Sequence, residues 1–262
     1  MSERVAIVTG ASSGNGRAIA VRLAEDGFAV VCSDLREQAR GDGYETDLET
    51  PTHRVIERSG GSSRFFRADV SRLADVQALV DHAVSEFGRL DVMVNNAGVT
   101  VSLGSIVEES EEDFDRNIAI NLKGVWIGSK LAIQQFMTQE VVGEVRGNVI
   151  NIASIGGVIG LDEEPAYCAS KGGVVNLTRQ LAVDFAKHRI RATAVCPGFM
   201  VTAMVRPYLE DPKLAQALQD SSPWPSLGTA NDVASAVAFL ASPESRWVTG
   251  STLMVDGGYT AR

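Results

Sequence analysis

The stretch VAIVTGASSGNG at residues 5–16 decides the fold of this chain. Its first four residues are apolar and predict a buried strand, and the glycine-rich turn after them leads into a helical pattern. Glycine allows a tight turn and a close backbone approach, and the free N–H groups at a helix N-terminus bind anions. The order of these elements predicts a nucleotide-binding unit, although ordinary loops also use glycine and the spacing G-x3-G-x-G departs from G-x-G-x-x-G.

Similar short runs of Val, Ile and Ala recur along the chain, separated by amphipathic stretches. Most are apolar almost without interruption, which is typical of parallel strands covered on both faces. We expect strands at residues 5–9, 29–33, 64–68, 90–95, 148–153, 191–196 and 252–255, and helices at 16–26, 71–87, 110–138, 167–187 and 231–241. This pattern predicts an α/β fold with a doubly wound, Rossmann-type, parallel seven-stranded sheet and helices on both faces, in a single domain of residues 1–262. A (β/α)8 barrel is the alternative, but it would need an eighth repeat.

Two segments break the regular alternation. Residues 37–51 are polar and glycine-containing, and they follow the second predicted strand. Residues 203–225 carry four prolines around a short helical piece. Because long irregular segments in a compact domain are often binding loops, we expect residues 203–225 to form a flap over a substrate.

The composition narrows the possible partners. The chain has 24 Lys and Arg against 33 Asp and Glu, a formal net charge of −9, which argues against nucleic acid and more weakly against an anionic membrane surface. Cys32, Cys168 and Cys196 are scattered, which indicates reduced thiols. No apolar run approaches the roughly 18 residues of a membrane span, and no signal-peptide pattern is present, so we expect a cytoplasmic location.

Asp34 ends the second predicted strand, at about the separation from the glycines where an acid meets the adenosine ribose. A carboxylate there accepts hydrogen bonds from the ribose hydroxyls and repels a 2′-phosphate, which favours NAD over NADP. Ser13 adds no positive charge, but Arg17 and Arg36 leave a phosphate possible. The alternative is an Asp that caps the next turn.

Polar turns also follow the third and fourth predicted strands. Asp69 and Val70 follow the third, and the run Asn95-Asn96-Ala97-Gly98 ends the fourth. Ligands of open α/β sheets bind at the carboxyl ends of strands, which favours a cofactor role for both turns. Asp69 is equally typical of a helix cap, and the Asn pair of an ordinary turn.

Three side chains suggest the chemistry. Ser154 follows the fifth predicted strand, and Tyr167 and Lys171 lie four residues apart, on one face of a helix. A free phenol has a pKa of about 10, and a nearby ammonium group together with an oxidised nicotinamide would lower it. The tyrosinate could then remove an alcohol proton while Ser154 holds the oxygen. Taken singly, the pair also fits a surface contact, and the serine fits a cap.

Taken together, these motifs resemble the short-chain dehydrogenase/reductase family in its form of roughly 250 residues. The resemblance rests on TGASSGNG, NNAG, Ile120-Asn121, Ser154, the Tyr167-x-x-x-Lys171 pair, Pro197-Gly198 and the closing Asp256-Gly257-Gly258-Tyr259, which occur in order over nearly the whole chain. Two departures stand out. Asn15 replaces the usual Ile or Leu, and the segment after Arg36 is long.

The resemblance implies a role for each matching position. The expected cofactor site comprises Gly10, Ser12, Ser13, Gly14, Asn15, Gly16, Asp34, Leu35, Asp69, Val70, Asn96, Ala97, Gly98, Tyr167, Lys171, Pro197, Gly198 and Thr202. Tyr167 would be the general acid/base, Ser154 would orient the substrate oxygen, and Asn121 would kink its helix and hold a water that links Lys171 to solvent. No metal is implied.

These expectations point to an NAD-dependent oxidoreductase that interconverts a secondary alcohol, polyol or sugar hydroxyl and its carbonyl. The substrate pocket would be built by residues 99–103, the loop after Ser154 and the flap. The acids at 162–164 favour a neutral polyhydroxy substrate, and the alternative is that they are solvated loop charges. One alternative is a 3-oxoacyl thioester reductase with Arg206 and Lys213 as docking residues, and another is a non-catalytic NAD-binding sensor. The resemblance also implies a homotetramer, formed through the helices that start near Ser110 and Tyr167 together with the C-terminal segment.

Overall fold

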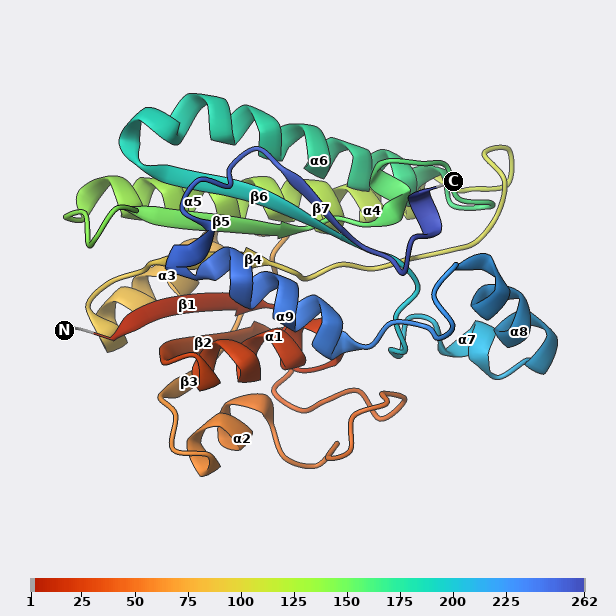
Figure 1. The fold of residues 1–262 in the computed structure, drawn as a ribbon, viewed down its shortest axis with the longest axis horizontal. Helices are drawn as coiled ribbons and strands as arrows, with labels where there is room; N and C mark the ends of the chain where they lie inside the picture. Colours follow the sequence, from red (N-terminus) through yellow and green to blue (C-terminus); the bar gives the residue numbers. More distant parts are fainter. Residues whose placement is uncertain (1–2, 262) are drawn as a thin grey trace.

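A computed structural model describes residues 3–261 and shows one parallel sheet of seven strands in the order β3-β2-β1-β4-β5-β6-β7 (Figure 1). The predicted doubly wound fold is confirmed, and each predicted strand is present with ends within two residues of the expected ones. The strands are β1 (Arg4–Thr9), β2 (Phe28–Asp34), β3 (Ser63–Arg67), β4 (Val92–Asn95), β5 (Gly147–Ile152), β6 (Ile190–Pro197) and β7 (Thr252–Val255).

Helices cover both faces of the sheet. They are α1 (Gly14–Glu25), α2 (Thr52–Arg58), α3 (Leu73–Phe87), α4 (Glu111–Asn117), α5 (Gly124–Thr138), α6 (Pro165–Phe185), α7 (Arg206–Leu209), α8 (Pro212–Ser221) and α9 (Ala230–Ala241). Helices α1 and α9 pack with one face of the strands in a single apolar core, and α3 and α5 pack with the other face. Alternate residues of β1 therefore serve different cores: Ala6 and Val8 face α1, while Val5 and Ile7 face α3 and α5.

Two expectations about helices need correction. The single helix expected at 110–138 is divided by a π-helical segment, Ile118–Lys123, that joins α4 to α5. Helix α2 was not predicted, because its seven residues follow directly on the irregular segment 37–51, which has no helix or strand. The flap contains α7 and α8 and stands beyond the carboxyl ends of the strands (Figure 1).

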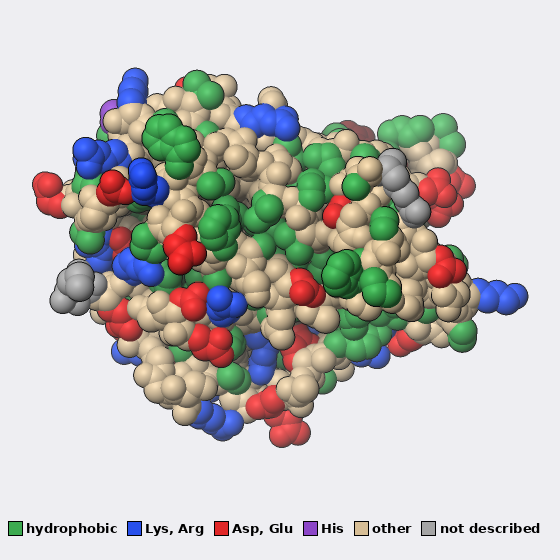
Figure 2. Space-filling model, in the orientation of Figure 1, with side chains coloured by type: hydrophobic (Ala, Val, Ile, Leu, Met, Phe, Trp, Pro, Cys, Tyr) green, Lys and Arg blue, Asp and Glu red, His purple; other side chains and the backbone are tan. Residues whose placement is uncertain are grey.

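The surface and the cysteines agree with the composition. Figure 2 shows acidic and basic side chains interspersed over the face in view. Within residues 3–261, no helix has both the length and the apolar character needed to cross a membrane. All three cysteines are free thiols, and Cys32 and Cys196 are buried.

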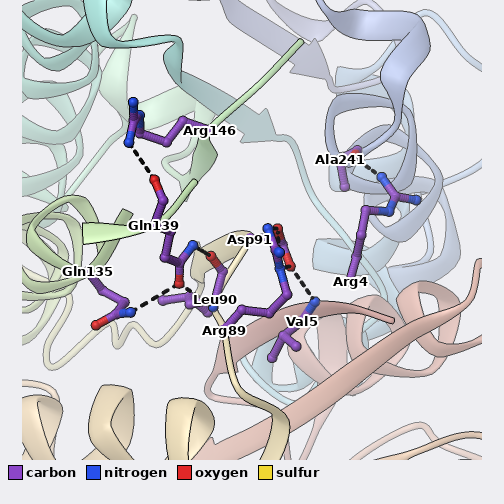
Figure 3. A network of polar contacts seen from close by, with 9 residues as sticks. All are labelled: Arg4, Val5, Arg89, Leu90, Asp91, Gln135, Gln139, Arg146 and Ala241. Carbon is purple, nitrogen blue, oxygen red and sulfur yellow. Dashed lines mark hydrogen bonds and ion pairs between the residues drawn. The ribbon is translucent and has the colours of Figure 1, made fainter. Parts of the chain in front are cut away.

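The amino ends of the central strands are joined by a polar network (Figure 3). Asp91 accepts a hydrogen bond from the Val5 amide at 2.8 Å and is paired with Arg89 at 2.6 Å. Gln139, at the end of α5, bonds both backbone groups of Leu90: its Nε2 donates to the carbonyl at 2.7 Å, and its Oε1 accepts from the amide at 2.8 Å. These contacts fix the entry to β4 against β1 and α5.

We predict that Gln139→Ala lowers the free energy of unfolding by about 2 kcal/mol, because two backbone groups of the buried Leu90 lose their partners. Urea denaturation checks this. Gln77→Ala is the matched control, since the Gln77 side chain bonds only the exposed Asp81, and it should cost under about 0.5 kcal/mol. Equal losses for the two variants would contradict the role given to Gln139.

Candidate functional site

A cavity of about 440 Å³ opens at the carboxyl ends of the strands. Its walls come from the β1–α1 turn, the ends of β2 to β6 and the start of the flap. Every residue expected in the cofactor site lines this cavity, namely Gly10, Ser12, Ser13, Gly14, Asn15, Gly16, Asp34, Leu35, Asp69, Val70, Asn96, Ala97, Gly98, Tyr167, Lys171, Pro197, Gly198 and Thr202. The structure thus brings together positions that are almost two hundred residues apart in the sequence.

At the floor of the cavity, the β1–α1 turn lies so close to the end of β4 that no side chain fits at Gly10 or Gly16. Gly10 and Gly14 have φ of +65° and +54°, a region that favours glycine. A Cβ on Gly16 would lie 2.0 Å from the Gly10 carbonyl oxygen, and one on Gly10 would lie 2.9 Å from the Ala97 Cα. Asn96 ties β4 to β1 by donating from Nδ2 to the Thr9 carbonyl at 2.8 Å. This arrangement provides the open backbone cradle that a dinucleotide needs.

At the adenosine end, Asp34 is held by the chain itself. Its Oδ1 accepts from the Leu35 amide at 2.7 Å, and its Oδ2 accepts from the Ser12 amide at 3.2 Å. The turn-capping alternative is therefore also realised, while the carboxylate still lines the cavity. Asp69 behaves in the same way: its Oδ1 accepts from the amide and the hydroxyl of Ser71.

The arginines that left a 2′-phosphate possible differ in their surroundings. Arg17 is buried and donates to the carbonyls of Asp47 and Thr50 at 2.7 and 2.9 Å, so it braces the segment 37–51 instead of facing the cavity. Arg36 lines the cavity. So does Arg40, a residue that the sequence analysis missed, and its guanidinium is paired with Asp42 at 2.7 Å. The side chains of Arg36 and Arg40 and the Asp34 carboxylate at the end of β2 are groups that can bind a nicotinamide dinucleotide.

The chemical end of the cavity is formed by Ser154, Tyr167 and Lys171. Ser154 Oγ accepts from the Gly156 amide at 3.1 Å, so the expected cap is present as well. The buried Lys171 donates from Nζ to the Ile152 carbonyl at 2.9 Å, and its Nζ lies 5.7 Å from the centre of the Tyr167 ring. The helical spacing has therefore placed the ammonium near the phenol ring, and both residues line the cavity.

In the chain by itself, burial determines the pKa of both Tyr167 and Lys171. Burial raises the pKa of Tyr167 to about 12, and a hydrogen bond with Ser154 opposes this rise. Burial also lowers the pKa of Lys171 to about 8. Desolvation is the largest influence on both groups in the chain by itself, and the lowering of the phenol pKa by Lys171 together with an oxidised nicotinamide stays a prediction.

Asn121 lies in the π-helical segment, fully buried, and does not line the cavity. Its Oδ1 accepts from the Val99 amide and its Nδ2 donates to the Val99 carbonyl, both at 2.8 Å. A Cβ on Gly98 would lie 3.2 Å from Asn121 Oδ1 and 3.4 Å from Lys171 Nζ. The interruption of the helix is therefore at the expected residue, and the relay through a water molecule stays a prediction.

A second cavity, of about 450 Å³, adjoins the first and shares Ser154 and Tyr167 with it. The expected substrate segments all contribute to its walls. Most lining side chains are apolar or aromatic, among them Val99, Val101, Leu103, Ile155, Leu161, Phe199, Met204, Val205 and Tyr208. Of the three acids at 162–164, only Glu164 lines this cavity, and burial raises its pKa, whereas Asp162 and Glu163 are exposed.

Arg206, one of the two docking residues of the alternative thioester reductase, is bonded within the chain. Its Nε donates to the Asp42 carbonyl at 2.6 Å and its Nη2 donates to the Gly43 carbonyl at 3.0 Å, so it joins the flap to the segment 37–51. These contacts occupy the Arg206 guanidinium, whereas Lys213, the second docking residue of that alternative, is exposed. Met200, Met204 and Val205 line the cofactor cavity without having been predicted, because no motif marks them.

Metal ligands were not expected at this site. Among residues 3–261, no group of three or more His, Cys, Asp or Glu side chains is arranged to hold a metal ion.

Comparisons with known proteins agree with this geometry. The family model described as enoyl-(acyl carrier protein) reductase matches residues 10–260. The 2-(R)-hydroxypropyl-CoM dehydrogenase of Xanthobacter autotrophicus is 37% identical, over 98% of this chain and 99% of its own length. The cis-4-hydroxycyclohexanecarboxylate dehydrogenase of Sinomonas cyclohexanicum is 40% identical, over 99% of this chain and 98% of its own length.

A solved structure from Agrobacterium tumefaciens with bound NADP superimposes with a TM-score of 0.86 at 32% identity, covering 100% of this chain and 98% of that one. The agreement extends over nearly the whole length in every case. The chain belongs to the short-chain dehydrogenase/reductase family.

Proposed function

We propose that this protein is an NAD-dependent dehydrogenase that interconverts a secondary alcohol and its ketone, with Tyr167 as the general acid/base. One observation carries the proposal: a cavity suited to a dinucleotide and a second, largely apolar cavity meet at Ser154 and Tyr167. An alcohol carbon in the second cavity would lie next to the cofactor end of the first. Alcohol–carbonyl oxidoreduction is also the activity in the names of the relatives described above.

In the proposed oxidation, the phenolate oxygen of Tyr167 takes the proton of the substrate hydroxyl and the carbon–oxygen bond becomes a carbonyl. A bound nicotinamide ring supplies the acceptor for the hydride that leaves the same carbon. Ser154 donates its hydroxyl proton to the substrate oxygen and aligns it. Because burial lowers the pKa of Lys171 to about 8, its ammonium can release and regain a proton near neutral pH, which suits a relay from Tyr167.

Support for NAD over NADP comes from the end of β2. The Asp34 carboxylate lines the cavity at the end where we propose that the adenosine ribose binds. Its negative charge would repel the 2′-phosphate of NADP. Arg17 bonds residues 47 and 50, and Arg40 is neutralised by Asp42. Of these three arginines, Arg36 is then the one that could offset the negative charge of Asp34.

The proposed substrate is a small cyclic or branched secondary alcohol. The apolar side chains that make up most of the second cavity's lining offer no hydrogen-bond partner to the additional hydroxyls of a polyol, whose desolvation is costly. Thr100, Ser102 and Glu164 also line this cavity and could bond a smaller number of further polar groups. Polyols and sugars are therefore the less favoured members of the predicted substrate class.

Two alternatives are less well supported. A 3-oxoacyl thioester reductase needs cationic docking residues, and Arg206 is already bonded within the chain. A non-catalytic NAD-binding sensor would have no use for Ser154, Tyr167 and Lys171 grouped at the junction of two cavities.

We also propose that the protein is a cytoplasmic homotetramer. The exposed side chains of Phe114, Trp126 and Val183 on α4, α5 and α6 support a contact between subunits through these helices.

We predict that Tyr167→Phe lowers kcat by about a thousandfold, since general acid/base catalysis contributes about 10² to 10⁴. NADH binding, followed by fluorescence, should stay within about twofold of the wild type, because the ring remains in place. A variant that keeps more than a tenth of the activity would rule out Tyr167 as the acid/base, and a wild type without turnover on any alcohol would favour the sensor.

We predict that the wild type binds NADH at least about tenfold more tightly than NADPH, because a 2′-phosphate would face the Asp34 carboxylate. Asp34→Asn removes the charge and keeps the shape and should narrow this ratio to about threefold or less. Titration of both dinucleotides by fluorescence gives the two ratios. Tighter binding of NADPH by the wild type would overturn the NAD assignment.

We predict that cyclohexanol is oxidised with a kcat/KM at least about a hundredfold above that of myo-inositol, which has the same ring with five further hydroxyls to desolvate. Initial rates of NADH formation test this. A preference for myo-inositol would contradict the proposed apolar substrate and restore the polyol.

A further inference from the structure

Residues 37–51 lie against the N-terminus of α1, where their side chains and backbone contact the glycine-rich turn. The Glu45 carboxylate accepts a hydrogen bond through Oε1 from the Gly14 amide. Nearby, the Arg40 amide donates to the Ser13 hydroxyl at 2.7 Å. The second carboxylate oxygen of Glu45 is buried and makes no hydrogen bond within residues 3–261. The Glu45 carboxylate is thus bound to the backbone of Gly14, a residue that lines the first cavity, although Glu45 does not itself line that cavity.

The position of this acid coincides with the anion-binding end of α1. The first N–H groups of a helix have no partner within the helix and carry a partial positive charge, which attracts anions. Gly14 is the first residue of α1 and one of the positions at which we expect the cofactor diphosphate. A carboxylate and a diphosphate cannot both accept from the Gly14 amide, and their charges repel each other.

Gly43 makes room for this contact. A Cβ on Gly43 would lie 1.9 Å from Glu45 Oε2, so the carboxylate can fold back to Gly14 only because residue 43 has no side chain. The blocking atom belongs to the free end of a flexible side chain. A larger residue at 43 would therefore displace the Glu45 carboxylate and leave the fold of the domain intact.

We propose that Glu45 determines cofactor affinity: its carboxylate takes the diphosphate's place on α1 and must leave when the dinucleotide binds. The inference rests on the proposed function, because it requires a dinucleotide in the first cavity. Residues 37–51 contain no helix or strand, so moving Glu45 breaks no regular hydrogen-bond ladder. The contact lowers the affinity for the cofactor and stabilises the chain when no cofactor is bound.

The same segment is joined to the flap. Arg206, the first residue of α7, donates to the carbonyls of Asp42 and Gly43, and its guanidinium lies 4.5 Å from the centre of the Tyr44 ring. The residue that follows Tyr44 is Glu45. A movement of Glu45 therefore reaches the start of the flap through Tyr44 and Arg206. Met204 and Val205, at the start of the flap, line both cavities.

Glu45→Gln and Gly43→Ala test the proposal by two different routes. The first removes the charge at constant shape, and the second pushes the carboxylate off Gly14. Both should bind NADH about fivefold more tightly than the wild type, since a charge-assisted hydrogen bond that competes with the ligand is weakened or lost. Dissociation constants come from titration of NADH fluorescence, without substrate and independently of turnover. Glu49→Gln is the control: it removes a charge from an exposed side chain of the same segment and should leave affinity within about twofold.

The outcomes separate the two proposals. Unchanged or weaker NADH binding in both Glu45→Gln and Gly43→Ala, with normal binding by the wild type, would show that Glu45 has only a structural role and would overturn this inference alone. Equal tightening in Glu49→Gln would do the same, because the effect would then be one of overall charge. A wild type that binds neither NADH nor NADPH would overturn the proposed function, and this inference with it.

Discussion

The contact between the β1–α1 turn and the end of β4 governs the geometry of this molecule. At this point two backbone segments pack with no space for a Cβ at Gly10 or Gly16, and Asn96 fastens them by a hydrogen bond to Thr9. A side chain at either glycine would separate β1 from β4 and move the first turn of α1 away from the sheet. The cradle, the position of Asp34 and the opening toward Tyr167 all depend on this close approach.

Burial and charge act against each other at the chemical end. The protein surrounds Tyr167 and Lys171 with apolar groups, so each is held nearer to its neutral form than in water. A bound cation would have a large effect in such surroundings, because little solvent is present to screen it. The same desolvation that makes the phenol a weak acid in the chain alone makes it sensitive to its ligands.

Local patterns in the sequence were sufficient for the strands, the parallel sheet and the residues around the first cavity. These features are encoded by neighbours in the chain: apolar runs, a glycine-rich turn, and Tyr167 four residues before Lys171. The features that were missed depend on contacts between distant segments. The pKa of Tyr167 depends on how deeply the ring is enclosed, the bonds of Arg206 join residues more than 160 positions apart, and Glu45 reaches Gly14 only after the chain has folded back. Helix α2 was missed because a helix of seven residues shows little periodicity, whereas the interruption at Asn121 was expected from the family resemblance and not from the helical pattern.

The two ends of the strands have different roles: one end holds the sheet together, and the other end forms the cavities. The network of Asp91, Arg89, Leu90 and Gln139 lies at the amino ends, while both cavities lie at the opposite ends. Loops at the carboxyl ends can therefore vary in length and composition without weakening the bonds that hold the sheet in register. Relatives whose names specify quite different alcohols still match this chain from end to end at 37% and 40% identity. An architecture with its anchoring and its chemistry on opposite rims lets selection revise the substrate while the frame is inherited unchanged.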